Sequence, residues 1–115
     1  MPASEIAPIA HAPVFHDEDL TLVFDAQHGS MGAFDRLVKR HERRMFRVAH
    51  NLLHHHEDAQ DAVQEAFLNA FRKLQQFQGR SKFSTWLTHI TVNQALAKAA
   101  QRAIVLEFAR GSHPR

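Results

Sequence analysis

EDAQDAVQEAFLNAFRKLQ, residues 57–75, carries the clearest helical pattern in this chain of 115 residues. Its apolar side chains recur at steps of three and four residues, which places them on one face of an α-helix. Acidic residues occupy the first turn, and Arg72 and Lys73 the last, an order that complements the helix dipole by about 0.3–1 kcal/mol per charge. The predicted buried face comprises Ala59, Ala62, Val63, Ala66, Phe67, Ala70, Phe71 and Leu74.

The segments on either side are also predicted to be helical. Residues 31–53 form one apolar stripe, in which His41 fills a gap; its other members are Phe34, Leu37, Val38, Met45, Val48, Ala49 and Leu52. A short helix over 17–28, ended by Gly29, and a last helix from near Ser81 or Ser84 to about Arg102 complete the set. We therefore expect an all-α fold, a small bundle of three to four helices.

The bundle is expected to span residues 17–102. Residues 1–16 are rich in Ala and Pro and are expected to form a flexible leader, and residues 103–115 a divergent or frayed tail. The histidines at 54–56 are predicted to make a turn, and residues 75–82 a polar loop around one glycine.

Composition excludes several classes of protein. A chain of this length holds one small domain. Cysteine is absent, which excludes disulfides and thiolate metal sites. The sequence has neither a run of about 18 apolar residues nor a signal-peptide pattern at its start, so we expect a cytoplasmic protein with no membrane partner.

Charged residues are segregated along the chain. Residues 1–35 carry six acids and neither Lys nor Arg, residues 36–47 six bases against one acid, and residues 57–65 four acids and no base. Residues 66–106 contain no acid at all. Such segregation indicates surfaces for partners of opposite charge, nucleic acid among them, although solvated helix faces would give the same pattern.

Three segments together resemble region two of bacterial sigma factors, in the extracytoplasmic-function (ECF) group of the sigma-70 family. They are GSMGAFDRLVKRH (29–41), DAQDAVQEAFLNAFRKL (58–74) and FQGRSKFSTWLTHITVN (77–93), and the resemblance covers about residues 18–97. It implies a helical domain that joins core RNA polymerase to promoter DNA and takes part in transcription initiation. A complete member of the family continues into a second helical domain, region four, which these 115 residues lack, and residues 97–115 depart from the family pattern.

The resemblance assigns two sets of residues. The first docks on the clamp helices of the largest polymerase subunit, and comprises Asp58, Asp61, Gln64 and Glu65. The second contacts the unpaired non-template strand of the minus-ten promoter element, and comprises Phe77, Gln78, Gly79, Arg80, Ser81, Lys82, Trp86, His89 and Asn93. From position alone, the acids could equally form a solvated first turn of their helix.

The residues of the second set differ in how well their chemistry supports that role. Arg80 and Lys82 have little structural use in an acid-free loop, which favours phosphate contact. Trp86 suits either base stacking or the core, and Asn93 either a base contact or helix packing. Phe83 and Leu87 are expected in the core.

Other chemistry finds little support in the sequence. His54–His56 invite a metal interpretation, but adjacent residues seldom share one ion and no cysteine accompanies them, so we expect a surface turn and no metal or cofactor. No catalytic constellation or phosphate-binding glycine loop is present, which predicts a protein that is not an enzyme. The basic run 36–47 fits duplex DNA, core polymerase or the acidic segments of the chain itself.

Three functions follow as hypotheses. The first is a sigma region-two module that initiates transcription. The second is a truncated sigma-like protein that binds core polymerase, or an anti-sigma partner, as a competitor without initiating. The third is a general basic helical DNA-binding protein.

Overall fold

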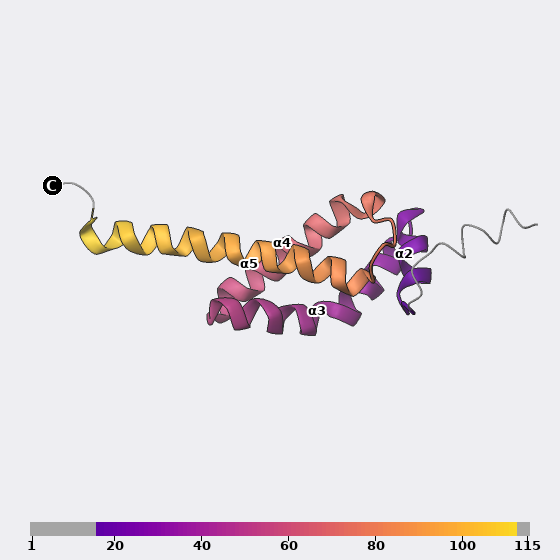
Figure 1. Cartoon of the computed structure of the whole chain (residues 1–115), viewed down its shortest axis with the longest axis horizontal. Coiled ribbons are helices and arrows are strands. Elements are labelled where there is room, and N and C mark those ends of the chain that lie inside the picture. Colours follow the sequence, from indigo (N-terminus) through magenta and orange to yellow (C-terminus); the bar gives the residue numbers. More distant parts are fainter. Residues whose placement is uncertain (1–15, 113–115) are drawn as a thin grey trace, which may run out of the picture.

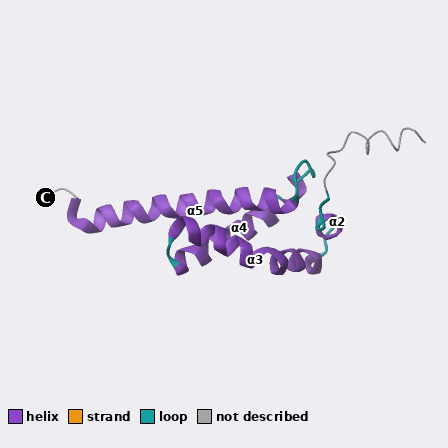
Figure 2. Cartoon of the chain, turned by 60° about the horizontal axis from the view of Figure 1, so that its bottom comes forward, coloured by secondary structure: helices purple, strands orange, loops and turns teal. Residues whose placement is uncertain are grey.

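The computed structural model describes residues 16–112, and every regular element in this range is helical (Figure 2). The helices are α2 (Leu20–Gln27), α3 (Met31–Leu53), α4 (His56–Arg72) and α5 (Phe83–Glu107). A 3₁₀ turn, η1 (Leu74–Gln76), follows α4, and a π-helical turn, η2 (Phe108–Ser112), follows α5. The predicted all-α class is confirmed. Residues 1–15 of the expected leader lie outside the described part.

Helices α3, α4 and α5 pack against one another, and α2 packs on α3 at one end of the bundle, close to the α4–α5 connection (Figure 1). Helix α5 then continues beyond the other helices as a single projecting arm (Figure 1). Its 25 residues span about 37 Å at 1.5 Å per residue. The sequence predicts an end near Arg102, whereas the helix continues to Glu107.

The core lies where α3, α4 and α5 meet. The predicted stripe of α4 is buried from Ala59 through Ala70, and α3 contributes Leu37, His41, Met45 and Ala49. Two residues predicted on these stripes are exposed, Phe71 at 45% and Leu52 at 43%, because each lies near a helix end, at the edge of the packed interface. Phe83 and Leu87 of α5 are fully buried, as expected.

Local side chains set the helix boundaries. Ser30 accepts a hydrogen bond from the backbone N–H of Ala33 at 3.0 Å and so caps α3, which starts and ends as the sequence predicts. At the other end of α3, His54 adopts a left-handed backbone with φ 54°, and His55 Nδ1 caps α4 by accepting from the N–H of Asp58 at 3.2 Å. The three histidines thus form the expected turn, although His56 already belongs to α4.

Candidate polymerase and nucleic-acid interfaces

Helix α4 presents the four residues expected to bind polymerase; Asp58, Asp61, Gln64 and Glu65 are called the acidic face below. Asp61, Gln64 and Glu65 are exposed, because they lie opposite the buried alanines of α4. Asp58 is different: its side chain is only 15% exposed, since it points toward the neighbouring helix α5.

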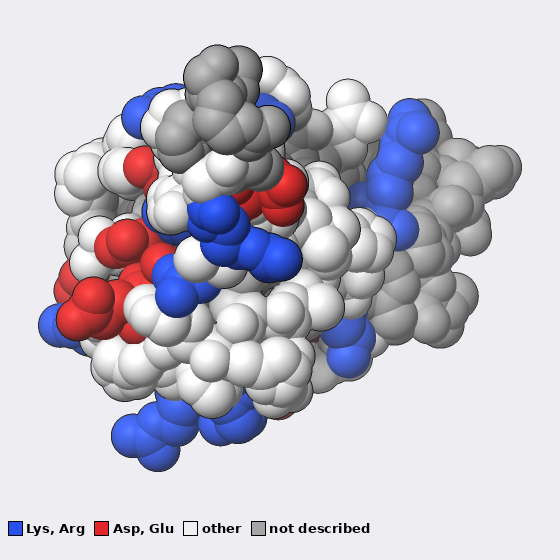
Figure 3. Space-filling view, turned by 90° about the vertical axis from the view of Figure 1, so that its left-hand side faces the viewer, with Lys and Arg blue, Asp and Glu red and all other residues white. Residues whose placement is uncertain are grey.

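Two cations of α5 reach this acidic face. Arg102 Nη1 lies 2.8 Å from Asp58 Oδ2, and Lys98 Nζ lies 3.7 Å from Asp61 Oδ2. His55 Nδ1 also lies 3.6 Å from Asp58 Oδ2. The view from the α5 end shows Asp and Glu side chains gathered on one flank with Lys and Arg beside them (Figure 3). Gln64 and Glu65 have no such partner within residues 16–112.

An apolar groove borders the acidic face, between α4 and α3. It encloses about 560 Å³ and is lined by Met31, Phe34, Val38, Glu42, Val63, Gln64, Phe67, Leu68 and Phe71. Leu68 is 48% exposed and follows Gln64 by one helical turn, so apolar surface continues directly from the acidic face. The sequence analysis missed this groove because it placed Phe71 in the core.

The loop after α4 is tied to α2 by side-chain amides. Gln27 Nε2 donates to the carbonyl oxygens of Leu74, at 2.9 Å, and Phe77, at 3.0 Å. In return, Gln75 Nε2 donates to the carbonyl oxygen of Gln27 at 2.8 Å. These three bonds fix the start of the 77–82 loop relative to α2.

Three aromatic rings pack against one another where the loop meets α5. The ring centroids of Phe77 and Trp86 are 5.1 Å apart, those of Phe83 and Trp86 5.7 Å, and those of Phe77 and Phe83 5.8 Å. Phe77 is 7% exposed and Phe83 fully buried, whereas Trp86 is half-buried. The expected role of Phe77 as a stacking face therefore does not fit its burial; Trp86 is the ring of this cluster that reaches solvent.

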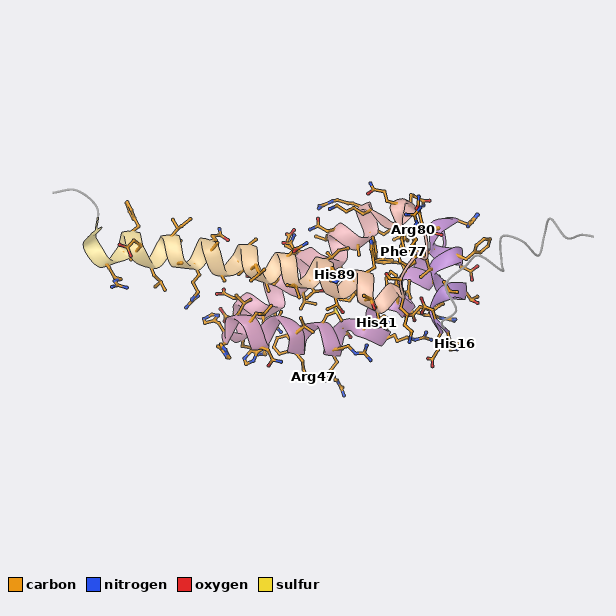
Figure 4. All side chains as sticks on the ribbon, viewed as in Figure 1. His16, His41, Arg47, Phe77, Arg80 and His89 are labelled. Atoms are coloured by element: carbon orange, nitrogen blue, oxygen red, sulfur yellow. The ribbon has the colours of Figure 1, made fainter. Side chains whose placement is uncertain are left out.

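The other predicted DNA-contacting residues lie at or near the surface. Gln78, Arg80, Lys82, His89 and Asn93 are exposed, and Gly79 and Ser81 partly so. Phe77 and Arg80 lie together in the α4–α5 connection, and His89 lies further along α5 (Figure 4). The set thus extends from the α4–α5 connection along α5 (Figure 4).

A pocket of about 440 Å³ opens between this loop and α2. Phe77, Gln78 and Gly79 form one wall, and the α2 wall comprises Leu20, Thr21, Val23, Phe24 and Gln27. Gly79 has φ +75°, a conformation that glycine adopts without strain, and this positive φ turns the chain at the rim of the pocket. The α2 wall was not found from the sequence, which offered no signal that α2 packs beside the loop.

Buried carboxylates anchor α5 to the chain before α2. Asp17 Oδ2 accepts from the backbone N–H of Phe83 at 2.9 Å, and so caps α5 across 66 residues of sequence. Asp19 is also buried, and its two oxygens lie 2.6 Å from Arg40 Nη1 and 2.7 Å from His41 Nε2. The sequence predicted a helix from residue 17, which would place both acids in its first turn; both instead precede α2 and hold the bundle together.

The histidines near the α3–α4 turn pack against an aromatic ring of α3. Within residues 16–112, no three His, Asp or Glu side chains come together in an arrangement that could hold a metal ion. His50 and His56 instead pack against Phe46, with ring centroids 5.6 and 5.1 Å apart. In the same range, no helix combines the length and apolar character needed to cross a membrane.

The described part of the chain is a small helical domain with acidic residues exposed on α4 and a basic loop that precedes α5, with Trp86 in the first turn of α5. The Sigma-70 region 2 family model matches residues 37–103, more than half of the chain. The chain belongs to the Sigma-70 region 2 family, and its relatives include ECF sigma factors.

Curated relatives agree over this part of the chain. The RNA polymerase sigma-H factor of Pseudomonas aeruginosa is 39% identical over 79 residues, 69% of this chain and 41% of that protein. The ECF RNA polymerase sigma factor SigE of Mycolicibacterium smegmatis is 35% identical over 113 residues, 87% of this chain and 44% of that protein. The chain thus spans less than half the length of these relatives.

Two solved structures share the fold. An engineered region 2 of sigmaE, solved by NMR in complex with GTAAAA, has a TM-score of 0.65 and 36% identity, covering 80% of this chain and 90% of that one. CnrH, in complex with the cytosolic domain of CnrY, has a TM-score of 0.67 and 33% identity, covering 82% of this chain and 62% of that one.

Proposed function

We propose that this chain is a transcription-initiation module that binds core RNA polymerase through the acidic face and the minus-ten promoter element through the 77–82 loop and α5. The observation that carries the proposal is the exposure of both sets on one rigid bundle: Asp61, Gln64 and Glu65 on α4, and Arg80 and Lys82 at the start of α5. Family membership and the engineered sigmaE region 2 solved with GTAAAA support it.

On the polymerase side, the partner is the clamp helices of the largest subunit. Exposed carboxylates and an amide at three- and four-residue spacing suit a partner helix that carries basic side chains, and such charge pairs set register and association rate more than affinity. The apolar groove beside Gln64, with Leu68 exposed at its edge, supplies surface whose burial would contribute affinity.

On the DNA side, the ligand is the unpaired non-template strand. Trp86 offers the accessible ring on which a base can stack, which contributes about 1–3 kcal/mol per base. Arg80 and Lys82 neutralise phosphates, and the pocket between α2 and Gly79 has room for one flipped base. Phe77 serves this site indirectly, by holding Trp86 and the loop backbone in place.

The module acts by binding and carries no catalytic residues of its own. It needs no cofactor, because stacking, charge and hydrogen bonding perform the recognition. Its site of action is the cytoplasm, where bacterial RNA polymerase and promoter DNA are found.

Co-purification with core RNA polymerase tests the proposal. The double variant Asp61→Asn, Glu65→Gln should lose most of the bound polymerase, while a matched variant at exposed acids elsewhere, Glu18→Gln with Asp25→Asn, should keep it. Equal retention by both variants would contradict a role for the acidic face and would favour a general DNA-binding protein.

A second function is a competitor that occupies core polymerase, or an anti-sigma partner, without initiating. The structure of CnrH in complex with the cytosolic domain of CnrY supports this alternative, because it is a protein of the same fold bound to a protein partner. Run-off transcription with core polymerase distinguishes the two: a transcript that depends on this chain supports initiation, and polymerase binding without a transcript supports competition.

A further inference from the structure

Helix α3 carries a row of arginines that take no part in the proposed polymerase and minus-ten contacts. Arg36, Arg40, Arg43, Arg44 and Arg47, called the arginine stripe below, are all exposed. Four of them follow the i, i+4, i+7, i+11 spacing of one helix face, so they extend over about 16 Å at 1.5 Å per residue. Arg47 points away from the bundle into solvent (Figure 4).

Among the described acids, only Asp19 pairs with a member of the stripe. Arg40 pairs with the buried Asp19 at 2.6 Å and also reaches the carbonyl oxygen of Glu18 at 3.5 Å. No ion pair within residues 16–112 involves any other member of the stripe. On α3 itself, Asp35 pairs with Lys39. Glu42 lines the apolar groove between α3 and α4 and a second pocket between the same two helices. The stripe therefore presents an excess of uncompensated positive charge.

The stripe approaches the start of α5. A pocket of about 400 Å³ lies between Arg40 and Arg44 of α3 and Lys82 and Ser84, and Asp17, Glu18 and Asp19 also line it. Asp17 and Asp19 are buried and bound to Phe83, Arg40 and His41, whereas Glu18 is exposed. Lys82 is the last residue of the proposed DNA-binding loop and the N-cap of α5. Basic side chains of the loop and of α3 thus flank this pocket on two sides, with the acid Glu18 among them.

We infer that the arginine stripe binds the backbone phosphates of double-stranded DNA that adjoins the melted segment. This inference rests on the proposed function and extends its DNA footprint to a helix outside the loop and α5. Duplex DNA fits a linear row of guanidinium groups because its phosphates are closely spaced, and each guanidinium matches phosphate geometry with two parallel hydrogen bonds. The position of Lys82 on the same pocket as Arg40 and Arg44 favours DNA over an acidic protein segment, because one nucleic acid would then meet both the loop and the stripe.

The test compares two DNA probes and measures binding by fluorescence anisotropy over a range of salt concentrations. One probe is a labelled single-stranded oligonucleotide containing GTAAAA, and the other is the same strand extended by a 20-base-pair duplex. The variant is Arg44→Gln with Arg47→Gln in the full chain. The matched control is Arg72→Gln with Lys73→Gln, which removes the same charge at the end of α4.

We expect the stripe variant to bind the single strand like the unaltered chain and to lose affinity for the extended probe. Its slope of log affinity against log salt on that probe should be shallower by about 1.8, since each phosphate contact on duplex DNA contributes about 0.9. The control pair should leave this slope unchanged.

Three outcomes would overturn the inference: an unaltered slope in the stripe variant, an equal loss in the control pair, or poly-glutamate competing with the duplex as effectively as DNA does. Failure of the unaltered chain to bind the single-stranded probe would instead contradict the proposed minus-ten recognition. The slope difference on the extended probe is read separately, so the two failures are distinguishable. Circular dichroism confirms that the variants are folded.

Discussion

Arg102 of α5 forms an ion pair with Asp58 of α4, with 2.8 Å between Nη1 and Oδ2. The aspartate is one of the four residues proposed to bind core polymerase, and the arginine lies five residues before the end of α5 at Glu107. Under the proposed function, Arg102 therefore competes with a basic side chain of polymerase for Asp58.

Arg102→Gln should therefore strengthen polymerase binding while weakening the fold slightly. The side chain of Arg102 is 43% exposed, so the pair contributes only about 0.2–1 kcal/mol to the free energy of unfolding. Thermal unfolding and a polymerase-binding titration at low and high salt measure the two effects. Arg110→Gln, which removes a charge further along the arm, is the control; weaker binding by Arg102→Gln would show that Arg102 positions Asp58 rather than competing for it.

Asp17→Ala should destabilise the whole domain. The variant removes the carboxylate that caps α5 at Phe83 and that also accepts from the N–H of Asp19 at 3.0 Å. Loss of an N-cap costs about 0.5–2 kcal/mol, and the burial of this carboxylate places the loss toward the upper end of that range. Urea unfolding compares it with Ser30→Ala, whose cap is local; an equal or smaller loss for Asp17→Ala would show that the long-range cap is unimportant.

His41→Ala should cost more stability than Arg40→Ala, although both side chains bind Asp19. His41 is buried and packs on Phe83 with ring centroids 5.7 Å apart, so its loss leaves a cavity and an under-satisfied buried carboxylate, together about 3–5 kcal/mol. The side chain of Arg40 is 45% exposed, and its loss leaves His41 on the carboxylate. Chemical denaturation of both variants checks the order, and the reverse order would contradict this account of the Asp19 cluster.

The sequence predicted the helices well where local chemistry determines them. The stripe of α3 and the alanine face of α4 both depend on residues close in sequence, so periodicity sufficed. Asp17 and Asp19 were misassigned because their partners, Phe83 and His41, lie 66 and 22 residues away. Nothing in the local pattern separates a long-range cap from a first-turn acid.

In the candidate site, too, local features were predicted from the sequence and long-range packing was not. The spacing of Asp58, Asp61 and Glu65 predicted one exposed face of α4; Asp61 and Glu65 are exposed, whereas the side chain of Asp58 is only 15% exposed and pairs with Arg102 of α5. The family resemblance assigned Phe77 to the DNA contacts, but only the fold shows that its ring is buried and packs against Phe83 and Trp86. The α2 wall of the loop pocket likewise depends on packing that no motif encodes.

Variants at Trp86 and Phe77 should have different effects, the first mainly on DNA affinity and the second mainly on the free energy of unfolding. Trp86→Ala should weaken binding of single-stranded GTAAAA-containing DNA by about 1–3 kcal/mol, because it removes the accessible stacking ring. Phe77→Ala should instead lower the free energy of unfolding by about 3–5 kcal/mol, the usual cost of truncating a buried phenylalanine. Any loss of DNA affinity by this variant should then reflect unfolded protein or a displaced Trp86 and loop, since Phe77 itself offers no exposed stacking face.

The chain supplies its own probe for this prediction. Trp86 is the one tryptophan of the sequence, so its fluorescence reports on this ring alone. Adding the oligonucleotide should quench it in the unaltered chain if a base stacks on the ring, and Thr85→Ala, a change at an exposed neighbour, should leave the quenching intact. Binding seen by anisotropy without any change in Trp86 fluorescence would place the strand elsewhere on the domain and exclude Trp86 as the stacking platform.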